Sequence, residues 1–302
     1  MKSNRRIIDT HTVGQGGIIF SFVNTIIMLF VIAVTLYPFI YVFLASVSDP
    51  NQIRASSGLL LWPKGFNVDG YSVVMQDSAI KTGYLNTLFY VSVGTFLNVA
   101  ATGMLAFVLA QKNHMLRTPL SWMIILPMFL NGGLIPTFLV VRSLGLYNSV
   151  WAVILTSLIS TWNLIIMRTN FQQIPDSLLE SARIDGANDI IILFKIVIPV
   201  SKAIIAVIAL YYAVGHWNSW FSAMIYLRNP KLKPLQLVMR EILILSTTDS
   251  LSKANTSMST HMRITENVKY ASIIVSTLPI LVVYPFVQKY FVKGVMIGSM
   301  KG

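Results

Sequence analysis

The sequence predicts an all-α polytopic membrane protein with six transmembrane helices. Hydrophobic residues make up 55% of the chain, charged residues make up 11%, and the mean hydropathy is +0.67. A soluble domain carries roughly a quarter charged residues, so this composition requires a membrane. Apolar stretches of about 20 residues, enough to cross a bilayer as a helix, recur along the chain. We expect the spans at about 18–47, 84–110, 120–141, 148–167, 203–227 and 270–288.

The first span is an uncleaved helix preceded by a short basic segment, residues 1–17. It is too long for the core of a signal peptide. Lys2, Arg5 and Arg6 precede it, and basic residues before a first span favour a cytoplasmic N-terminus. Over the whole chain, basic residues divide almost evenly between the two sides of the predicted topology. Residues 18–302 form one membrane domain, which ends in a tail at 289–302.

Several function classes are excluded by what the chain lacks. It contains no cysteine, so disulfides, thiolate metal sites and cysteine nucleophiles are absent. The predicted spans contain no Asp, Glu, Lys or Arg, the usual groups of ion-coupled pumps. No nucleotide-binding loop and no catalytic set can be assembled, so we expect no enzyme activity, cofactor or metal in this chain. The net charge of +12 is interpreted as membrane-surface balance, not nucleic-acid binding.

Residues 169–199 form a polar segment between the fourth and fifth spans. Pro175 is a helix entry, and Ser177 with Glu180 is typical of a capping box. Gly186 can adopt the left-handed conformation that ends a helix, and Asn188 or the next residue, Asp189, can cap a second helix. The pattern predicts a short amphipathic helix, a corner and a second helix that returns to the membrane.

The order of residues in this segment resembles the cytoplasmic EAA signature of permease subunits of ATP-driven (ABC) importers, EAA-x3-G-x9-I-x-L-P. The signature is matched by Glu180, Ala182, Gly186, Ile196 and Pro199, whereas Ser181 and Ile198 replace alanine and leucine. The sequence DGA at 185–187 is similar to the sugar-importer branch. Because the signature must face a cytoplasmic ATPase, it places both termini in the cytoplasm of a bacterial cell.

The rest of the chain resembles the MalG-like family of sugar permeases, and the LplC/YtcP oligosaccharide group in particular. This similarity runs through LGLYNSVWAVIL and NLIIMRTNFQQIP, and through the tail KGVMIGSMKG. It implies the MetI/MalG-like type I importer fold and a heterodimer with a homologous second permease. It also implies a cytoplasmic ATPase dimer that binds ATP and magnesium, an extracytoplasmic solute-binding protein and a carbohydrate substrate.

The resemblance assigns roles to two groups of residues. The expected ATPase-coupling residues are Leu178, Leu179, Glu180, Ser181, Ala182, Asp185, Gly186 and Ala187. The expected ATPase-interface residues of the tail are Lys293, Gly294, Gly298, Lys301 and Gly302. The hydrophilic connection from Ala223 to Lys269 is interpreted as a long outer loop that contacts the binding protein.

A sugar path needs polar groups beside aromatic faces in an apolar wall. The candidates are Asn131, Gly132 and Gly133, which should interrupt the third span, and Trp162, His216, Trp217, Asn218 and Trp220. Interface tryptophans and helix-packing residues would give the same pattern. Two other functions stay open: an importer for another solute, such as amino acids or phosphate, and a membrane scaffold that translocates nothing.

Overall fold

The computed structural model describes residues 15–55, 58–111, 115, 117–130, 132–252, 267–282 and 285. Within these residues every regular element is a helix, and an isolated bridge joins Ser48 to Phe66. The described chain divides into two units, residues 15–71 with 267–274 and residues 72–252 with 275–282. The predicted all-α class is confirmed.

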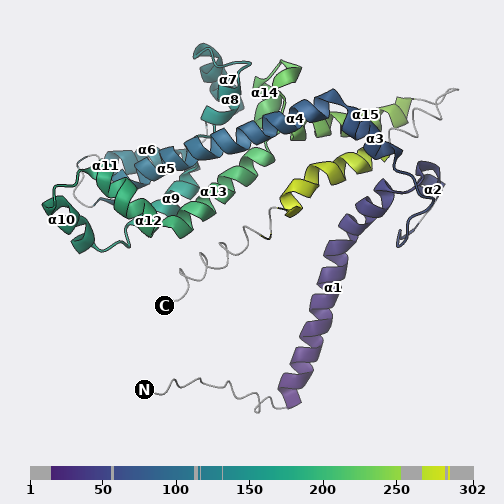
Figure 1. Ribbon diagram of the computed structural model, residues 1–302, viewed down its shortest axis with the longest axis horizontal. Coiled ribbons are helices and arrows are strands. Elements are labelled where there is room, and N and C mark those ends of the chain that lie inside the picture. Colours follow the sequence, from purple (N-terminus) through teal and green to yellow (C-terminus); the bar gives the residue numbers. More distant parts are fainter. Residues whose placement is uncertain are drawn as a thin grey trace. The chain divides into compact units, whose positions relative to one another are not determined.

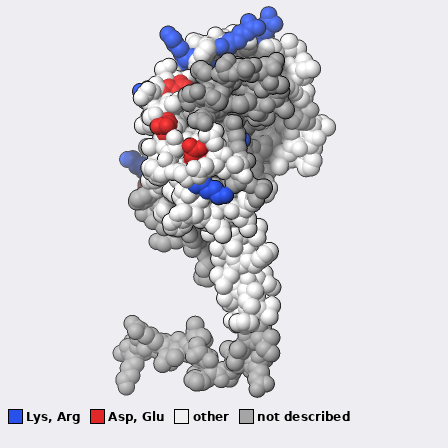
Figure 2. All heavy atoms as spheres, turned by 90° about the vertical axis from the view of Figure 1, so that its right-hand side faces the viewer, with Lys and Arg blue, Asp and Glu red and all other residues white. Residues whose placement is uncertain are grey.

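The first unit is built around α1 (Gln15–Ser46), drawn as one long helix in Figure 1. Its stretch Phe20–Ser46 is long and apolar enough to cross a membrane. Side chains are exposed along most of this stretch, and Figure 2 shows the described part of the helix without a charged side chain. Such a surface is stable only against lipid or another apolar surface. The short α2 (Pro50–Ala55) and the start of α3 (Asp69–Gln76) follow.

The second unit is built around one long helix of three parts. They are α4 (Ser78–Phe89), the π-helical turn η1 (Tyr90–Gly94) and α5 (Thr95–Ala110). Together they form a second helix long and apolar enough to cross a membrane. The helices α9 (Thr161–Phe171) and α13 (Lys202–Trp217) pack against α5. Their shared core contains Phe107, Leu164, Met167, Phe171 and Ile208.

Shorter helices complete the second unit. They are α6 (Arg117–Phe129), α7 (Leu134–Ser143), α8 (Val150–Leu155), α10 (Asp176–Ile184), α11 (Asp189–Ile192), η2 (Leu193–Val197), α12 (Ile198–Val200), α14 (Phe221–Tyr226), η3 (Pro230–Leu232) and α15 (Leu235–Ser252). A further helix, Asn267–Val282, belongs to the first unit up to residue 274 and to the second unit beyond it. In Figure 1, α10 and α11 lie at one end of the long helix, and α15 lies toward the other.

Three of the expected spans are interrupted in the structure. The break between α6 and α7 lies at the predicted glycines, Gly132 and Gly133. The expected span 148–167 is divided into α8 and α9, and the expected span 203–227 is divided into α13 and α14. The helix Asp189–Val200 meets α13 at a bend of 87°, and this pair would make a third crossing if it forms one span. This bend lies at Ser201, two residues beyond Pro199.

The connection 223–269 is not a structureless loop in its described part. The helix α15 packs against α4, and its side chains at Leu235 and Leu237 are buried. The Leu235 N–H donates to Thr87 Oγ1 at 2.8 Å. The connection was expected to be hydrophilic throughout, but residues 235–245 are largely apolar and belong to this packed helix.

Candidate functional site

A tight corner joins α10 to α11 and is closed by its own backbone. Gly186 lies there with a φ of +83°. Its N–H donates to the Arg183 carbonyl at 3.0 Å, and the Ala187 N–H donates to the Ala182 carbonyl at 2.9 Å. This pair of bonds forms a Schellman motif, which requires a left-handed residue just after the helix. The predicted helix end at Gly186 is therefore confirmed.

The two helices beside the corner begin in different ways. Asn188 Oδ1 accepts the Ile191 N–H at 2.9 Å, so the predicted cap of α11 is Asn188. The predicted capping box of α10 is wrong. This helix already begins at Asp176, with Pro175 at its N-cap and no side-chain cap bond. Pro175 leaves the chain extended at the entry, so Ser177 falls inside the first turn, where its carbonyl accepts Ser181 Oγ–H at 2.8 Å.

The side chains of α10 separate into an inward and an outward face. Leu179 and Ala182 pack against the core of the second unit, together with Ala187 from the corner. Leu178 is 42% exposed and Ile184 is 86% exposed. The expected coupling residues include Leu178, Leu179 and Ala182 but omit Ile184. Ile184 shares its helical face with Ser177 and Ser181, so the pattern reads as polar there.

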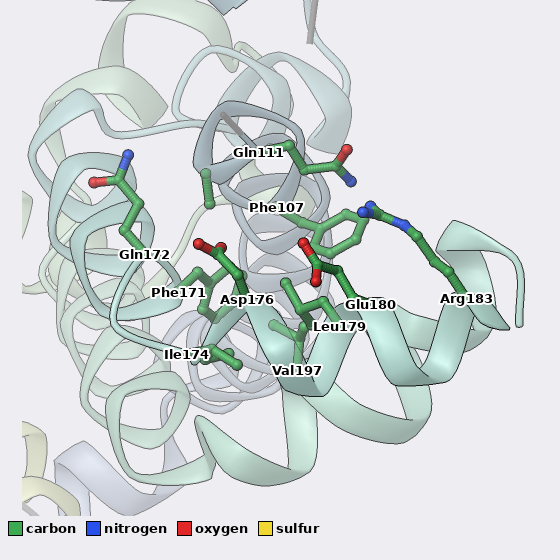
Figure 3. Close-up of a pocket in the computed structure, with 11 residues that line it drawn as sticks. Phe107, Gln111, Phe171, Gln172, Ile174, Asp176, Leu179, Glu180, Arg183 and Val197 are labelled. Carbon is green, nitrogen blue, oxygen red and sulfur yellow. The ribbon is translucent and has the colours of Figure 1, made fainter. Parts of the chain in front are cut away.

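A third side of α10 borders a cavity of about 170 Å³. Figure 3 shows the carboxylates of Asp176 and Glu180 and the guanidinium of Arg183 at this cavity, with Phe107 and Phe171 behind them. These three charged residues are spaced at i, i+4 and i+7, so they share one side of the helix. The remaining lining residues are Ala110, Gln111, Gln172, Ile174, Leu179 and Val197. This arrangement can accept a polar or cationic side chain. In the described part of the chain, no cluster of three His, Asp or Glu residues could hold a metal.

A buried polar network lies at the other end of α9, around the break that separates it from α8. Asn98 Nδ2 donates to the carbonyls of Ser157 and Leu158, at 2.6 and 2.9 Å. Because both amide hydrogens are used, Asn98 Oδ1 is the acceptor for His216 Nε2 at 2.8 Å, and His216 carries its proton on Nε2. Sequence reasoning did not single out Asn98, because nothing local links it to the break.

A second pair of residues completes this network. The Tyr212 hydroxyl accepts the Ser160 N–H at 2.9 Å and shares a hydrogen bond of 2.7 Å with Thr102. The backbone groups of the break, which would otherwise be unpaired in an apolar interior, are thus bonded to side chains from α5 and α13. A Cβ atom on Gly94 would lie 2.5 Å from His216 Nε2, so only glycine permits this approach.

The remaining sugar-path candidates differ in how far they are exposed. Trp162 is 63% exposed, and Trp220 is partly covered by Arg240, whose guanidinium lies 4.5 Å from the ring centroid. His216 and Trp217 are buried, whereas Asn218 is exposed. A Cβ atom on Gly132 or Gly133 would meet no atom within 4 Å. Two further predictions lie outside the described residues: Asn131 and the tail with Lys293, Gly294, Gly298, Lys301 and Gly302.

Residues 102–297 match the family model described as "Binding-protein-dependent transport system inner membrane component". The chain belongs to this family. Its members are non-catalytic membrane subunits of ABC transporters, so the prediction of a permease without enzyme activity is confirmed. The matched region includes α9, α10, its corner and α13, whereas Asn98 and Gly94 of the polar network precede it.

Two curated relatives of this permease come from Bacillus subtilis (strain 168). The chain is 40% identical over 266 residues to the polygalacturonan/rhamnogalacturonan transport system permease protein YtcP, covering 88% of this chain and 92% of the relative. It is 38% identical over 288 residues to protein LplC, covering 95% and 97%. The predicted resemblance to the LplC/YtcP group is confirmed.

A solved structure with the same fold is the crystal structure of a bacterial ABC transporter involved in the import of the acidic polysaccharide alginate. The TM-score is 0.83 at 32% sequence identity, and the match covers 92% of this permease and 98% of the solved chain. The predicted importer-permease fold is therefore confirmed, and the chain is a membrane protein of a binding-protein-dependent transport system.

Proposed function

We propose that this permease is the translocating subunit of an ABC importer for a carbohydrate, specifically an oligosaccharide. Two relatives support this proposal. YtcP is named as a permease of a polygalacturonan/rhamnogalacturonan transport system, and the solved structure is of a transporter involved in the import of alginate. An importer for amino acids or phosphate, and a scaffold that moves no solute, are less compatible with these relatives.

The proposed assembly is a heterodimer with a homologous second permease in a bacterial cell membrane. A cytoplasmic ATPase dimer supplies the energy, and an extracytoplasmic solute-binding protein delivers the carbohydrate. In this arrangement the chain crosses the bilayer six times, with both termini in the cytoplasm. The broken pairs α6 with α7, α8 with α9, and α13 with α14 then each contribute to one crossing. No nucleic acid takes part.

The helix α10 is the proposed contact with the ATPase, and one observation carries this assignment. Leu179 and Ala182 fix the helix on the core, the Schellman corner closes its end, and Ile184 is left 86% exposed. Leu178 is also 42% exposed, so this fixed helix presents two large apolar side chains within the segment that resembles the EAA signature. In this proposal Leu178 and Ile184 give apolar contact, Glu180 and Asp185 give polar anchors, and Leu179 and Ala182 transmit movement to the core.

This proposal is tested by placing a charge at the outward position. We expect Ile184→Glu to abolish solute-stimulated ATP hydrolysis and weaken co-purification of the ATPase, because a carboxylate would have to be desolvated at the contact. The reconstituted four-component importer supplies the measurement. Ile184→Met is the matched control, since it keeps an apolar side chain of similar size and should retain stimulation.

The fold should survive both changes at Ile184, because the side chain is exposed, so equal thermal stability of the two variants is part of the expected result. Wild-type stimulation in Ile184→Glu would exclude α10 as the coupling element.

The carbohydrate assignment is tested separately. Uptake can be assayed with oligogalacturonate, alginate oligosaccharides and an amino acid mixture in parallel. Uptake of the amino acids alone would overturn the carbohydrate assignment.

The energy source is the second part of the proposal. ATP and magnesium are held by the partner ATPase subunits, and this chain contributes no cofactor site. Because the predicted spans carry no Asp, Glu, Lys or Arg, we expect uptake to persist in ATP-loaded proteoliposomes after ionophores collapse the proton and sodium gradients. Loss of uptake with ATP still present would indicate a coupled ion.

A further inference from the structure

Residues 58–66 of the first unit present an unusual apolar surface. Leu59, Leu61, Trp62 and Phe66 are between 71% and 81% exposed, whereas Leu60, in the middle of the same run, is only 2% exposed. Single exposed apolar residues are ordinary, but four large ones within eight positions indicate a contact surface. The run contains one charged residue, Lys64, at its far end.

The outward direction of these side chains is imposed by a firm frame. Leu60 packs with Ala45 and Ile53, and its N–H donates to the Tyr37 hydroxyl at 3.1 Å. At the other end of the run, the Lys64 N–H donates to Ser48 Oγ at 3.1 Å. The Asp49 N–H contacts the carbonyls of residues 64 and 65, both at 2.9 Å. The run is therefore held at both ends, and its apolar side chains cannot turn inward together.

The two hydrogen-bonded positions of the run, Leu60 and Lys64, lie at different levels along α1. Lys64 is bonded beside Ser48, just past the end of the helix at Ser46, whereas Leu60 is bonded to Tyr37. At a rise of about 1.5 Å per residue, Tyr37 lies about 13 Å from Ser46 along the helix axis, toward the N-terminus of α1. The run therefore returns alongside the apolar helix and places Leu59, Leu61 and Trp62 at the depth of its last turns.

Exposed apolar and aromatic side chains of α1 lie at this depth. Phe39 and Phe43 are 65% and 53% exposed on the same stretch of helix, and Tyr37 and Tyr41 form an aromatic pair there. Tyrosine and tryptophan gather where the hydrocarbon meets the headgroups, and lysine reaches from that level to phosphate.

We propose that residues 59–66 form an interfacial anchor in the leaflet at the C-terminal end of α1. Leu59, Leu61 and Trp62 lie below the headgroups, Phe66 lies at their level, and Lys64 contacts lipid phosphate. The anchor fixes the depth of the helix and of the folded connection that follows it. We propose that lipid covers these residues. The alternative, which the test below separates, is that a second permease or a solute-binding protein covers them.

A depth measurement by spin labelling tests the anchor, and the absence of cysteine makes it direct. Single cysteines replace Leu61, Phe66 or Gln52 in the assembled importer in lipid nanodiscs, and each carries a nitroxide. We expect the ratio of oxygen to nickel-complex collisions to fall in the order Leu61, Phe66, Gln52. The control, Gln52, is exposed and lies on α2 beyond the end of α1.

Two results would overturn the anchor. A label at Leu61 that collides with the nickel complex as often as the label at Gln52 would place the run in water. A label shielded from both reagents would mean that protein covers it, and loss of shielding on removing the binding protein would identify that partner. The measurement uses neither ATP nor solute, so it is independent of the role proposed for α10.

Discussion

The chain bends before α9 and again after α10, and the two bends are stabilised in opposite ways. The corner after α10 is closed by bonds between residues only three to five positions apart, with Gly186 and Asn188 at its centre. The break before α9 is held by Asn98 and Tyr212, whose sequence separations from their partners are 52 to 60 residues. The first bend depends only on bonds within its own segment. The second bend depends on side chains from α5 and α13, so it requires these helices to be packed against α9.

This difference suggests a division of work in the proposed importer. The corner gives α10 a fixed shape that does not depend on the rest of the bundle, which suits an element that must dock on another protein. The break joins α8 and α9 to α5 and α13 through buried polar groups, whose pairing in a low-dielectric interior is strongly specified.

The largest effect that separates the two bends is expected at Asn98. Replacement by leucine leaves the carbonyls of Ser157 and Leu158 and the Nε2–H of His216 without partners. Each unsatisfied buried group costs about 1–3 kcal/mol, so we expect a loss of about 3 kcal/mol or more. Thermal unfolding of the purified permease in detergent measures it. A loss no larger than that of the local cap variant Asn188→Ala, about 1 kcal/mol, would contradict the distinction.

A smaller effect is expected at Gly186. A Cβ atom there would meet no atom within 4 Å, so Gly186→Ala tests the backbone alone. At a φ of +83° an L-residue is strained by about 1–2 kcal/mol. Asparagine tolerates this region better, so Gly186→Asn is the matched control and should lose less stability. Equal stability of alanine and glycine at this position would show that the corner does not keep its left-handed residue.

The smallest effect is expected at the ion pair that spans the corner. Arg183 Nη2 lies 3.3 Å from Asp189 Oδ1, and the two side chains are 46% and 63% exposed. Exposed pairs contribute about 0.5 kcal/mol or less and are screened by salt. We expect Arg183→Gln to change the unfolding temperature barely, and the residual difference to vanish in high salt. A large loss of stability that persists in high salt would contradict this expectation and show that the ion pair stabilises the corner.

The predictability of the two bends follows from the same distinction. Gly186 and Asn188 carry their conformational preferences within a few residues, so the sequence predicted both. The capping box failed within this same segment, because Pro175 starts the helix earlier than the serine pattern suggests. The break at 156–160 lies inside an apolar run that satisfies the length of a span. Its hydrogen-bond partners lie on other helices, and no local pattern indicates them.

The membrane class and the importer-permease fold were predictable because composition and one spaced motif carry them. The division of α10 into an inward and an outward face was only half predictable. Leu178, Leu179 and Ala182 follow a helical period, but which of them faces the core depends on where Phe107 and Phe171 lie in the folded bundle. The exposure of Ile184 could not be predicted for the same reason, because it depends on where the neighbouring core lies in the folded bundle.

The close approach of Gly94 to His216 makes these two positions interdependent across evolution. With the imidazole 2.5 Å from where a Cβ atom on residue 94 would stand, neither side chain can grow unless the other shrinks. We therefore expect covariation in homologous permeases: alanine or serine at 94 should occur with a residue smaller than histidine at 216. Lineages that keep histidine at 216 should keep glycine at 94, whatever solute their importers carry.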